Sequence, residues 1–190
     1  SNTTGGNNTA VGYQSLYSNT TASNNTAVGY QAGYSNQTGH EVVAVGLTAL
    51  FSNTASWNTA VGGQAAYSTT SGTGITAVGS NVLYSNTTGG MNAGFGGVDQ
   101  NSYYPALYSN TTGNHNSAFG PGALAKNTTG SSNTSVGSLS LYSNTTANNN
   151  VAVGYQAGYS NTTGTQNTFI GMTAGYATTT GSYNTCIGFQ

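Results

Sequence analysis

Residues 150–164 read Asn-Val-Ala-Val-Gly-Tyr-Gln-Ala-Gly-Tyr-Ser-Asn-Thr-Thr-Gly, and variants of this stretch fill most of the 190 residues of the chain. Each of eleven copies carries a marker glycine that directly follows a large apolar residue. Successive markers lie 17, 17, 16, 17, 17, 24, 17, 17, 17 and 17 residues apart. They are Gly12, Gly29, Gly46, Gly62, Gly79, Gly96, Gly120, Gly137, Gly154, Gly171 and Gly188. A short fixed period of this kind indicates a solenoid, in which each unit packs on its neighbours.

The composition favours order through repetition rather than around one central core. Only 35% of the residues are hydrophobic and only 2% are charged, whereas charged residues make up about a quarter of an ordinary globular domain. The fourteen Tyr and the regularly placed Val argue against a disordered chain. A single Lys in the whole chain gives no electrostatic surface for nucleic acid, and no apolar run is long enough to span a bilayer.

Two columns of strand-forming residues stand before the marker glycine. The residue directly before it is always β-branched or aromatic, and the residue two positions earlier is Thr or Val in nine of eleven copies. Because side chains alternate along a strand, both columns share one face, which we expect to point into the coil. The small residue between them, such as Ala152, is then expected to face outward and to suit contact with another chain. The predicted core ladder is Val11, Val28, Val45, Val61, Val78, Phe95, Phe119, Val136, Val153, Ile170 and Ile187.

Two further columns predict ladders along the coil. Five residues after the marker, nearly every copy has an aromatic residue, and rings at the spacing of neighbouring strands are expected to stack. This predicted aromatic ladder is Tyr17, Tyr34, Phe51, Tyr67, Tyr84, Tyr108, Tyr142, Tyr159 and Tyr176. Four residues before the marker, Asn occupies nine of eleven copies, from Asn8 to Asn184. Stacked amides there would hydrogen-bond up and down the coil.

These patterns predict an all-β parallel β-solenoid (β-roll or β-helix) of about eleven 17-residue repeats, each with two short strands and two turns. Residues 1–190 form a single array, whose ends fall part-way through a repeat, and we expect a fragment of a longer fibre. The spacing of 24 residues predicts an inserted loop at about residues 97–105. Asp99, Tyr103 and Tyr104 could serve recognition there, and a bulge without function is the alternative.

The Asn-Thr-Ala-Val-Gly-Tyr-Gln-Ala pattern at residues 25–32 resembles the repeats of phage-type tail fibres. It is also similar to the head repeats of trimeric autotransporter adhesins. The resemblance to these adhesins implies a parallel β-roll that assembles as a trimer, located outside the cell or on a virion. We therefore expect a structural or adhesive fibre shaft whose partner is itself, as a homotrimer or a head-to-tail filament, with cell-surface carbohydrate as a possible further partner.

The titratable residues do not favour catalysis or metal binding. The two carboxylates, Glu41 and Asp99, are 58 positions apart, and the imidazoles of His40 and His115 lack clustered partners. We expect no enzyme activity, no catalytic or metal residue and no cofactor. Cys186 is the one cysteine, so it has no intrachain disulfide partner, and we expect a small packed residue.

Two other functions remain open at this point. Asn-x-Ser/Thr motifs at the predicted corners could carry N-glycans and make the chain a glycan-coated filament, although an Asn- and Thr-rich corner also creates such motifs by composition alone. The candidate sites are Asn2, Asn19, Asn36, Asn86, Asn110, Asn127, Asn144 and Asn161. An ice-binding solenoid is a minor alternative, because Thr162 and Thr163 are adjacent, whereas a flat Thr array requires alternation.

Overall fold

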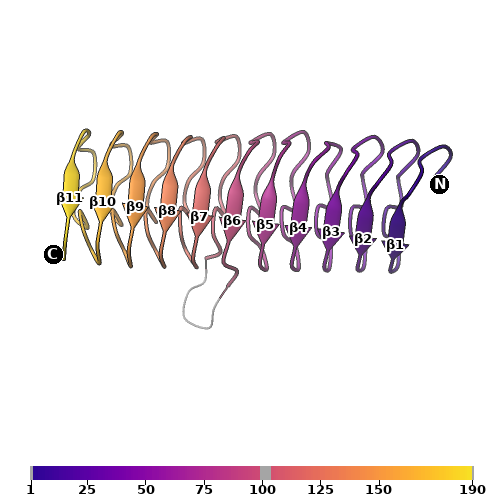
Figure 1. Ribbon diagram of the computed structural model, residues 1–190, viewed down its shortest axis with the longest axis horizontal. Helices are drawn as coiled ribbons and strands as arrows, with labels where there is room; N and C mark the ends of the chain where they lie inside the picture. The colour runs from indigo at the N-terminus through magenta and orange to yellow at the C-terminus, as the bar shows by residue number, and fades with distance from the viewer. Residues whose placement is uncertain (1, 99–103, 190) are drawn as a thin grey trace.

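The computed structural model describes residues 2–98 and 104–189. These residues form an all-β, parallel solenoid that makes one turn, here called a rung, per repeat. Figure 1 shows the rungs side by side from one end of a rod to the other. The three-residue strands are β1 (Thr9–Val11), β2 (Thr26–Val28), β3 (Val43–Val45), β4 (Thr59–Val61), β5 (Thr76–Val78), β6 (Ala93–Phe95), β7 (Ser117–Phe119), β8 (Thr134–Val136), β9 (Val151–Val153), β10 (Thr168–Ile170) and β11 (Thr185–Ile187).

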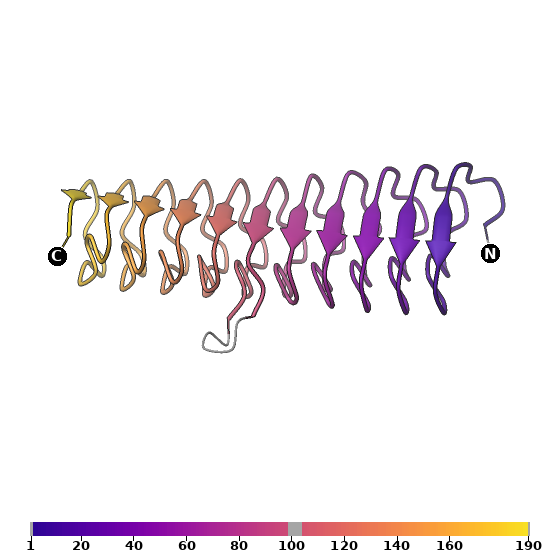
Figure 2. The same ribbon diagram turned by 60° about the horizontal axis from the view of Figure 1, so that its bottom comes forward.

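The strands form one sheet in chain order, and equivalent residues pair without slip. Val11 lies opposite Val28, and Phe95 lies opposite Phe119 even though 24 residues separate them. At about 4.8 Å per strand, eleven rungs make a rod about 50 Å long. The strands turn gradually about the long axis from β1 to β11, as expected for the twist of a sheet (Figure 2). Each column of the sequence therefore becomes a row along the rod.

The remainder of each rung is turn, whereas the sequence predicts a second strand there. Gln156, two residues after the marker glycine of β9, has a φ of 55°, and Leu141, four residues after the marker of β8, has a φ of 46°. The same left-handed conformation recurs at equivalent positions of other rungs. Two such positions within three residues bend the chain too sharply for an extended segment. The prediction of two strands per repeat is therefore wrong.

The interior of the coil is a narrow column of Ala and Leu side chains. The middle residue of a strand, such as Ala152, is completely buried, and it packs in one cluster with the Leu residues four positions after the marker. These buried leucines are Leu16, Leu50, Leu83, Leu124 and Leu141, and Leu107 takes the same place in the long repeat. The prediction that the middle residue faces outward is wrong, because the thin interior accepts one small side chain opposite each Leu.

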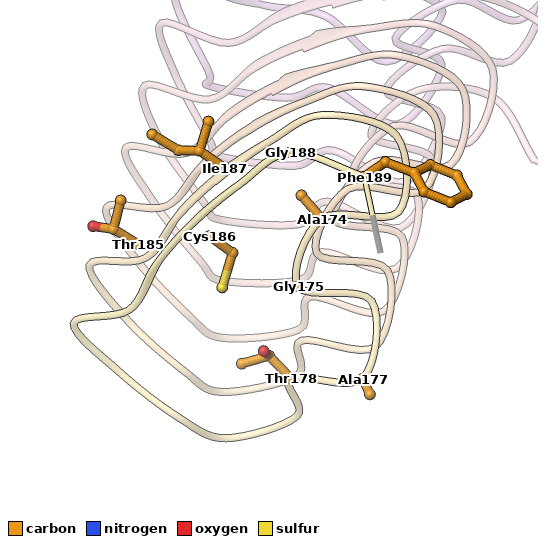
Figure 3. A pocket seen from close by; sticks show the side chains of 9 residues that line it. All are labelled: Ala174, Gly175, Ala177, Thr178, Thr185, Cys186, Ile187, Gly188 and Phe189. Atoms are coloured by element: carbon orange, nitrogen blue, oxygen red, sulfur yellow. The ribbon is translucent and has the colours of Figure 1, made fainter.

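The last described rung shows this orientation directly. A pocket lies at the end of the coil, and Figure 3 shows Cys186 pointing into it while Thr185 and Ile187 point away. Cys186 is partly buried and packs against the core cluster. It takes the place that Ala152 has in β9.

The coil continues across the long repeat between β6 and β7. The Ala106 amide donates to the Gly96 carbonyl at 2.9 Å, and this bond matches the turn that Ala32 closes on Gly29 in an ordinary rung. The sequence therefore has nine residues between Gly96 and Ala106, where an ordinary rung has two between the bonded residues. The candidate recognition residues Asp99 and Tyr103 lie outside the described residues.

Candidate interaction surface

The residues directly before the marker glycines form a row, called here the apolar stripe, in which Val45, Val78 and Phe95 are half-buried and the other members are exposed. It consists of Val11, Val28, Val45, Val61, Val78, Phe95, Phe119, Val136, Val153, Ile170 and Ile187. Val153 in the middle of the rod is 38% exposed, and Ile187 in the last rung is 73% exposed. The prediction that this column forms the core is wrong: the rows do stack in register, but on the outer face of the coil. A protein in water rarely leaves so continuous an apolar row uncovered.

A second row, called here the flanking column, runs beside the apolar stripe on the same face. It contains the first residue of each strand, which is Thr or Val in nine rungs and Ala93 or Ser117 in the other two. Glu41 and Lys126 are the charged residues in the described part of the chain, and neither belongs to a strand. The face formed by the two rows is therefore uncharged in the described part of the chain.

The aromatic ladder runs along another side of the rod. From Tyr17 to Tyr108 the rings stack with centroids 5.0–5.5 Å apart and planes within 12° of parallel. Tyr142, Tyr159 and Tyr176 continue the stack at 5.1–5.2 Å. Because each ring covers the faces of its neighbours, ring edges and phenol groups remain for a ligand rather than ring faces.

Tyr104, from the long repeat, bridges a gap in the aromatic ladder. Ala125 stands where other rungs have a ring, so Tyr108 and Tyr142 are not direct neighbours. Tyr104 meets both rings edge-on, with centroids 6.4 Å from Tyr108 and 5.5 Å from Tyr142. Lys126 Nζ lies 4.7 Å from the centroid of the Tyr142 ring. Burial, reinforced by Tyr104, raises the pKa of Tyr142 to about 12.

Two rows of Asn side chains hold the turns together inside the coil. In the predicted row, Asn133 Oδ1 accepts the backbone N–H of Asn150 at 3.0 Å, and Asn150 Nδ2 donates to the Gly164 carbonyl at 2.9 Å. The second row, which the sequence interpretation placed at solvent-facing corners, is also internal. There Asn144 Nδ2 donates to Asn127 Oδ1 at 2.8 Å and to the Ala147 carbonyl at 3.2 Å.

This second row contradicts most of the candidate glycosylation sites. The buried candidates are Asn19, Asn36, Asn86, Asn110, Asn127, Asn144 and Asn161. An N-glycan replaces a hydrogen on Nδ2, so it would break these internal bonds and has no path to solvent. Asn2 is the exposed member of the predicted set. The glycan-coated filament therefore loses nearly all of its predicted attachment points.

Other chemistry finds little support in the described part of the chain. No group of three or more His, Cys, Asp or Glu side chains lies close enough together there to hold a metal ion. His40 and His115 are both exposed. Residues 2–98 and 104–189 contain no helix long and apolar enough to cross a membrane. Thr162 is half-buried, with its hydroxyl donating to the Thr179 carbonyl at 3.1 Å, while Thr163 is exposed, so the two do not form one flat Thr array.

Comparison with known proteins leaves the family open. No family model matches the chain, and no match is found among the curated proteins or among the solved structures.

Proposed function

We propose that this chain is the shaft of a homo-oligomeric extracellular or virion fibre with a structural or adhesive role. The observation that carries the proposal is the apolar stripe, which runs along the rod from Val11 to Ile187 on the outer face of the sheet. About 50 Å of stripe and flanking column, about 10 Å wide, makes a face of about 500 Å². The stripe is the apolar half of this face, and the flanking column, which has Thr in seven of its eleven rungs, is the more polar half.

A second copy of the chain is the occupant that best fits the face. Two copies have the same rung spacing, so every rung of one meets a rung of the other, whereas a globular partner has no matching period. The face carries no charge in the described residues, so like copies do not repel each other across it. Burial of the stripe against other copies covers its Val, Ile and Phe side chains, and the internal hydrogen-bond ladders of each coil favour a stiff shaft.

An adhesive role would use a different part of the rod. The stripe is occupied in the assembled fibre, and stacking covers the ring faces of the aromatic ladder. A carbohydrate partner would therefore meet the phenol groups and edges of the aromatic ladder, or exposed turn residues such as Thr163. The N-glycan alternative is not favoured, since seven of its eight predicted sites are buried.

A charge placed on the stripe tests the proposal. The variant carrying both Val136→Asp and Val153→Asp is expected to keep the solenoid, because both residues are 38% exposed in the single chain, and to lose assembly. Circular dichroism measures the fold, and sedimentation velocity with electron microscopy measures assembly. The matched control is Ala152→Asp, which buries a charge in the core and is expected to unfold the rung. Assemblies of normal size from the double variant would refute the proposal.

A further inference from the structure

Two neighbouring rungs break the pattern of the apolar stripe. Phe95 and Phe119 replace the Val or Ile of the other nine rungs, and their rings stack with centroids 4.9 Å apart and planes 7° apart. In the same two rungs the flanking column has Ala93 and Ser117 instead of Thr or Val. The largest residues of one row therefore stand beside the smallest residues of the other.

This pairing gives the face a raised block next to a hollow at one level of the rod. Ala93 pairs with Ser117, and Phe95 pairs with Phe119, in the same register as the other strands. Phe119 is 41% exposed, so its ring stands on the surface rather than folding into the coil. Elsewhere the two rows consist of β-branched residues that differ little in size from rung to rung.

We propose that β6 and β7 set the axial register of parallel copies, with the Phe pair of one copy packed over Ala93 and Ser117 of its neighbour. This inference rests on the proposed function, because it takes a second copy as the occupant of the stripe. Two rods related by a two-fold axis along their length present their strands in opposite directions, so the stripe of one faces the flanking column of the other at the same level. Large side chains then meet small ones in both rungs.

Other arrangements lose this match. When copies run in opposite directions about an axis along the strands, stripe faces stripe, so Phe95 meets Phe119 and hollow meets hollow. When parallel copies slip by one rung, about 4.8 Å, one Phe of each copy faces Thr76 or Thr134, which are larger than Ala93 and Ser117. Without β6 and β7, a slip would change little, because the other rungs are nearly alike. A local difference in side-chain size of this kind selects one register among several that are otherwise nearly equal in energy.

Disulfide cross-linking between singly substituted chains, mixed in a Cys186→Ala background, tests the register. A disulfide requires Cα atoms within about 7 Å, so Val61→Cys reports which residue faces it. The aligned partner is Thr59→Cys in the same strand, the slipped partner is Thr76→Cys in β5, and the antiparallel partner is Val153→Cys in β9. We expect the aligned pair to exceed each of the others about tenfold, the ratio that a preference of about 1.4 kcal/mol gives.

The second part of the experiment removes the difference in side-chain size between β6 and β7 and the other rungs. Phe95→Val, Phe119→Val, Ala93→Thr and Ser117→Thr together make β6 and β7 resemble the other rungs, and we expect the slipped pair to rise to the level of the aligned pair. If sedimentation shows assembly, two results would overturn the register assignment. One is an equal cross-link yield for the aligned and slipped pairs in the chain without these four substitutions, and the other is a dominant antiparallel pair. A monomer in sedimentation, with no cross-link in any mixture, would overturn the proposed function and this inference together.

Discussion

Phe169 occupies the space that a side chain on Gly158 would need, since a methyl group at Gly158 would lie 2.5 Å from Cδ2 of Phe169. The same ring crowds Gly175 in the next rung. Phe169 stands where most strands have Ala, and both glycines stand where central rungs have Leu, as at Leu141. The middle strand residue and the residue four positions after the marker therefore occur in two combinations of similar volume, Ala with Leu and Phe with Gly.

The first prediction concerns the replacement of the Phe and Gly combination by Ala and Leu. Phe169→Ala is expected to lower the free energy of unfolding by about 3–5 kcal/mol, because it leaves a cavity. Adding Gly175→Leu is expected to restore part of this loss, since Leu141 already adopts a φ of 46° at the equivalent position. In the unaltered chain Gly175→Leu is expected to destabilise through a clash with the ring. Chemical denaturation of the parent and the three variants measures the coupling between the two positions, and additive effects would contradict it.

The marker glycines are predicted to be intolerant of any side chain. Gly137 has a φ of 126°, and a Cβ there would lie 2.6 Å from the Gly154 carbonyl oxygen. Gly137→Ala is expected to cost about 1–3 kcal/mol from backbone strain, with the clash in addition. Gly63→Ala is the matched control, because its Cβ would meet nothing closer than the Ser80 hydroxyl at 3.8 Å. Similar melting temperatures for the two variants would show that the close stacking is wrong.

The internal Asn row is predicted to stabilise the turns. Asn144→Ala removes the donor from two buried acceptors, Asn127 Oδ1 and the Ala147 carbonyl, and is expected to cost about 1–3 kcal/mol. Thr146→Ala, an exposed change in the same turn, is expected to stay within about 0.5 kcal/mol of the parent. Denaturant unfolding compares the two. An Asn144 variant as stable as the Thr146 variant would mean that the row contributes nothing.

Tyr104 is predicted to control the titration of Tyr142. The pKa of Tyr142 is raised to about 12, first by burial and then by the neighbouring phenols. Because this folded pKa lies above the ordinary tyrosine value of 10.0, the stability that Tyr142 contributes is complete below pH 10.0 and is lost as the pH rises toward about 12. Tyr104→Ala is expected to lower the pKa of Tyr142, as followed by ultraviolet absorbance, and Tyr142→Phe serves as the spectroscopic blank. An unchanged titration would show that Tyr104 does not cover Tyr142.

The spacing of the marker glycines was sufficient to predict the parallel β-solenoid, but not that each repeat makes one rung. Gly137 shows the reason. It lies against the carbonyl group of Gly154, the marker of the next rung, and every rung that stacks in this way requires a glycine at the same position. The columns through Asn150 and Tyr159 could also be predicted, because residues at the same place in successive rungs must stack. These features depend on the period alone.

The inward and outward faces could not be predicted from alternation. Val153 and Ala152 alternate equally well in either direction, so alternation alone does not determine which of the two faces the interior. The coil interior is too narrow for a Val row because Leu141 and its equivalents already fill it from the turn opposite. The signal that sequence reasoning missed is the column four residues after the marker, which contains Leu, Gly and Ala but no polar residue in most rungs.

Sedimentation equilibrium of the unaltered purified chain tests the central claim most directly, because the apolar stripe is exposed only if the chain stays single. We expect an integral multiple of the 19.0 kDa chain mass that persists on dilution. A mass of 19.0 kDa at every concentration, with the solenoid intact by circular dichroism, would contradict the proposed assembly.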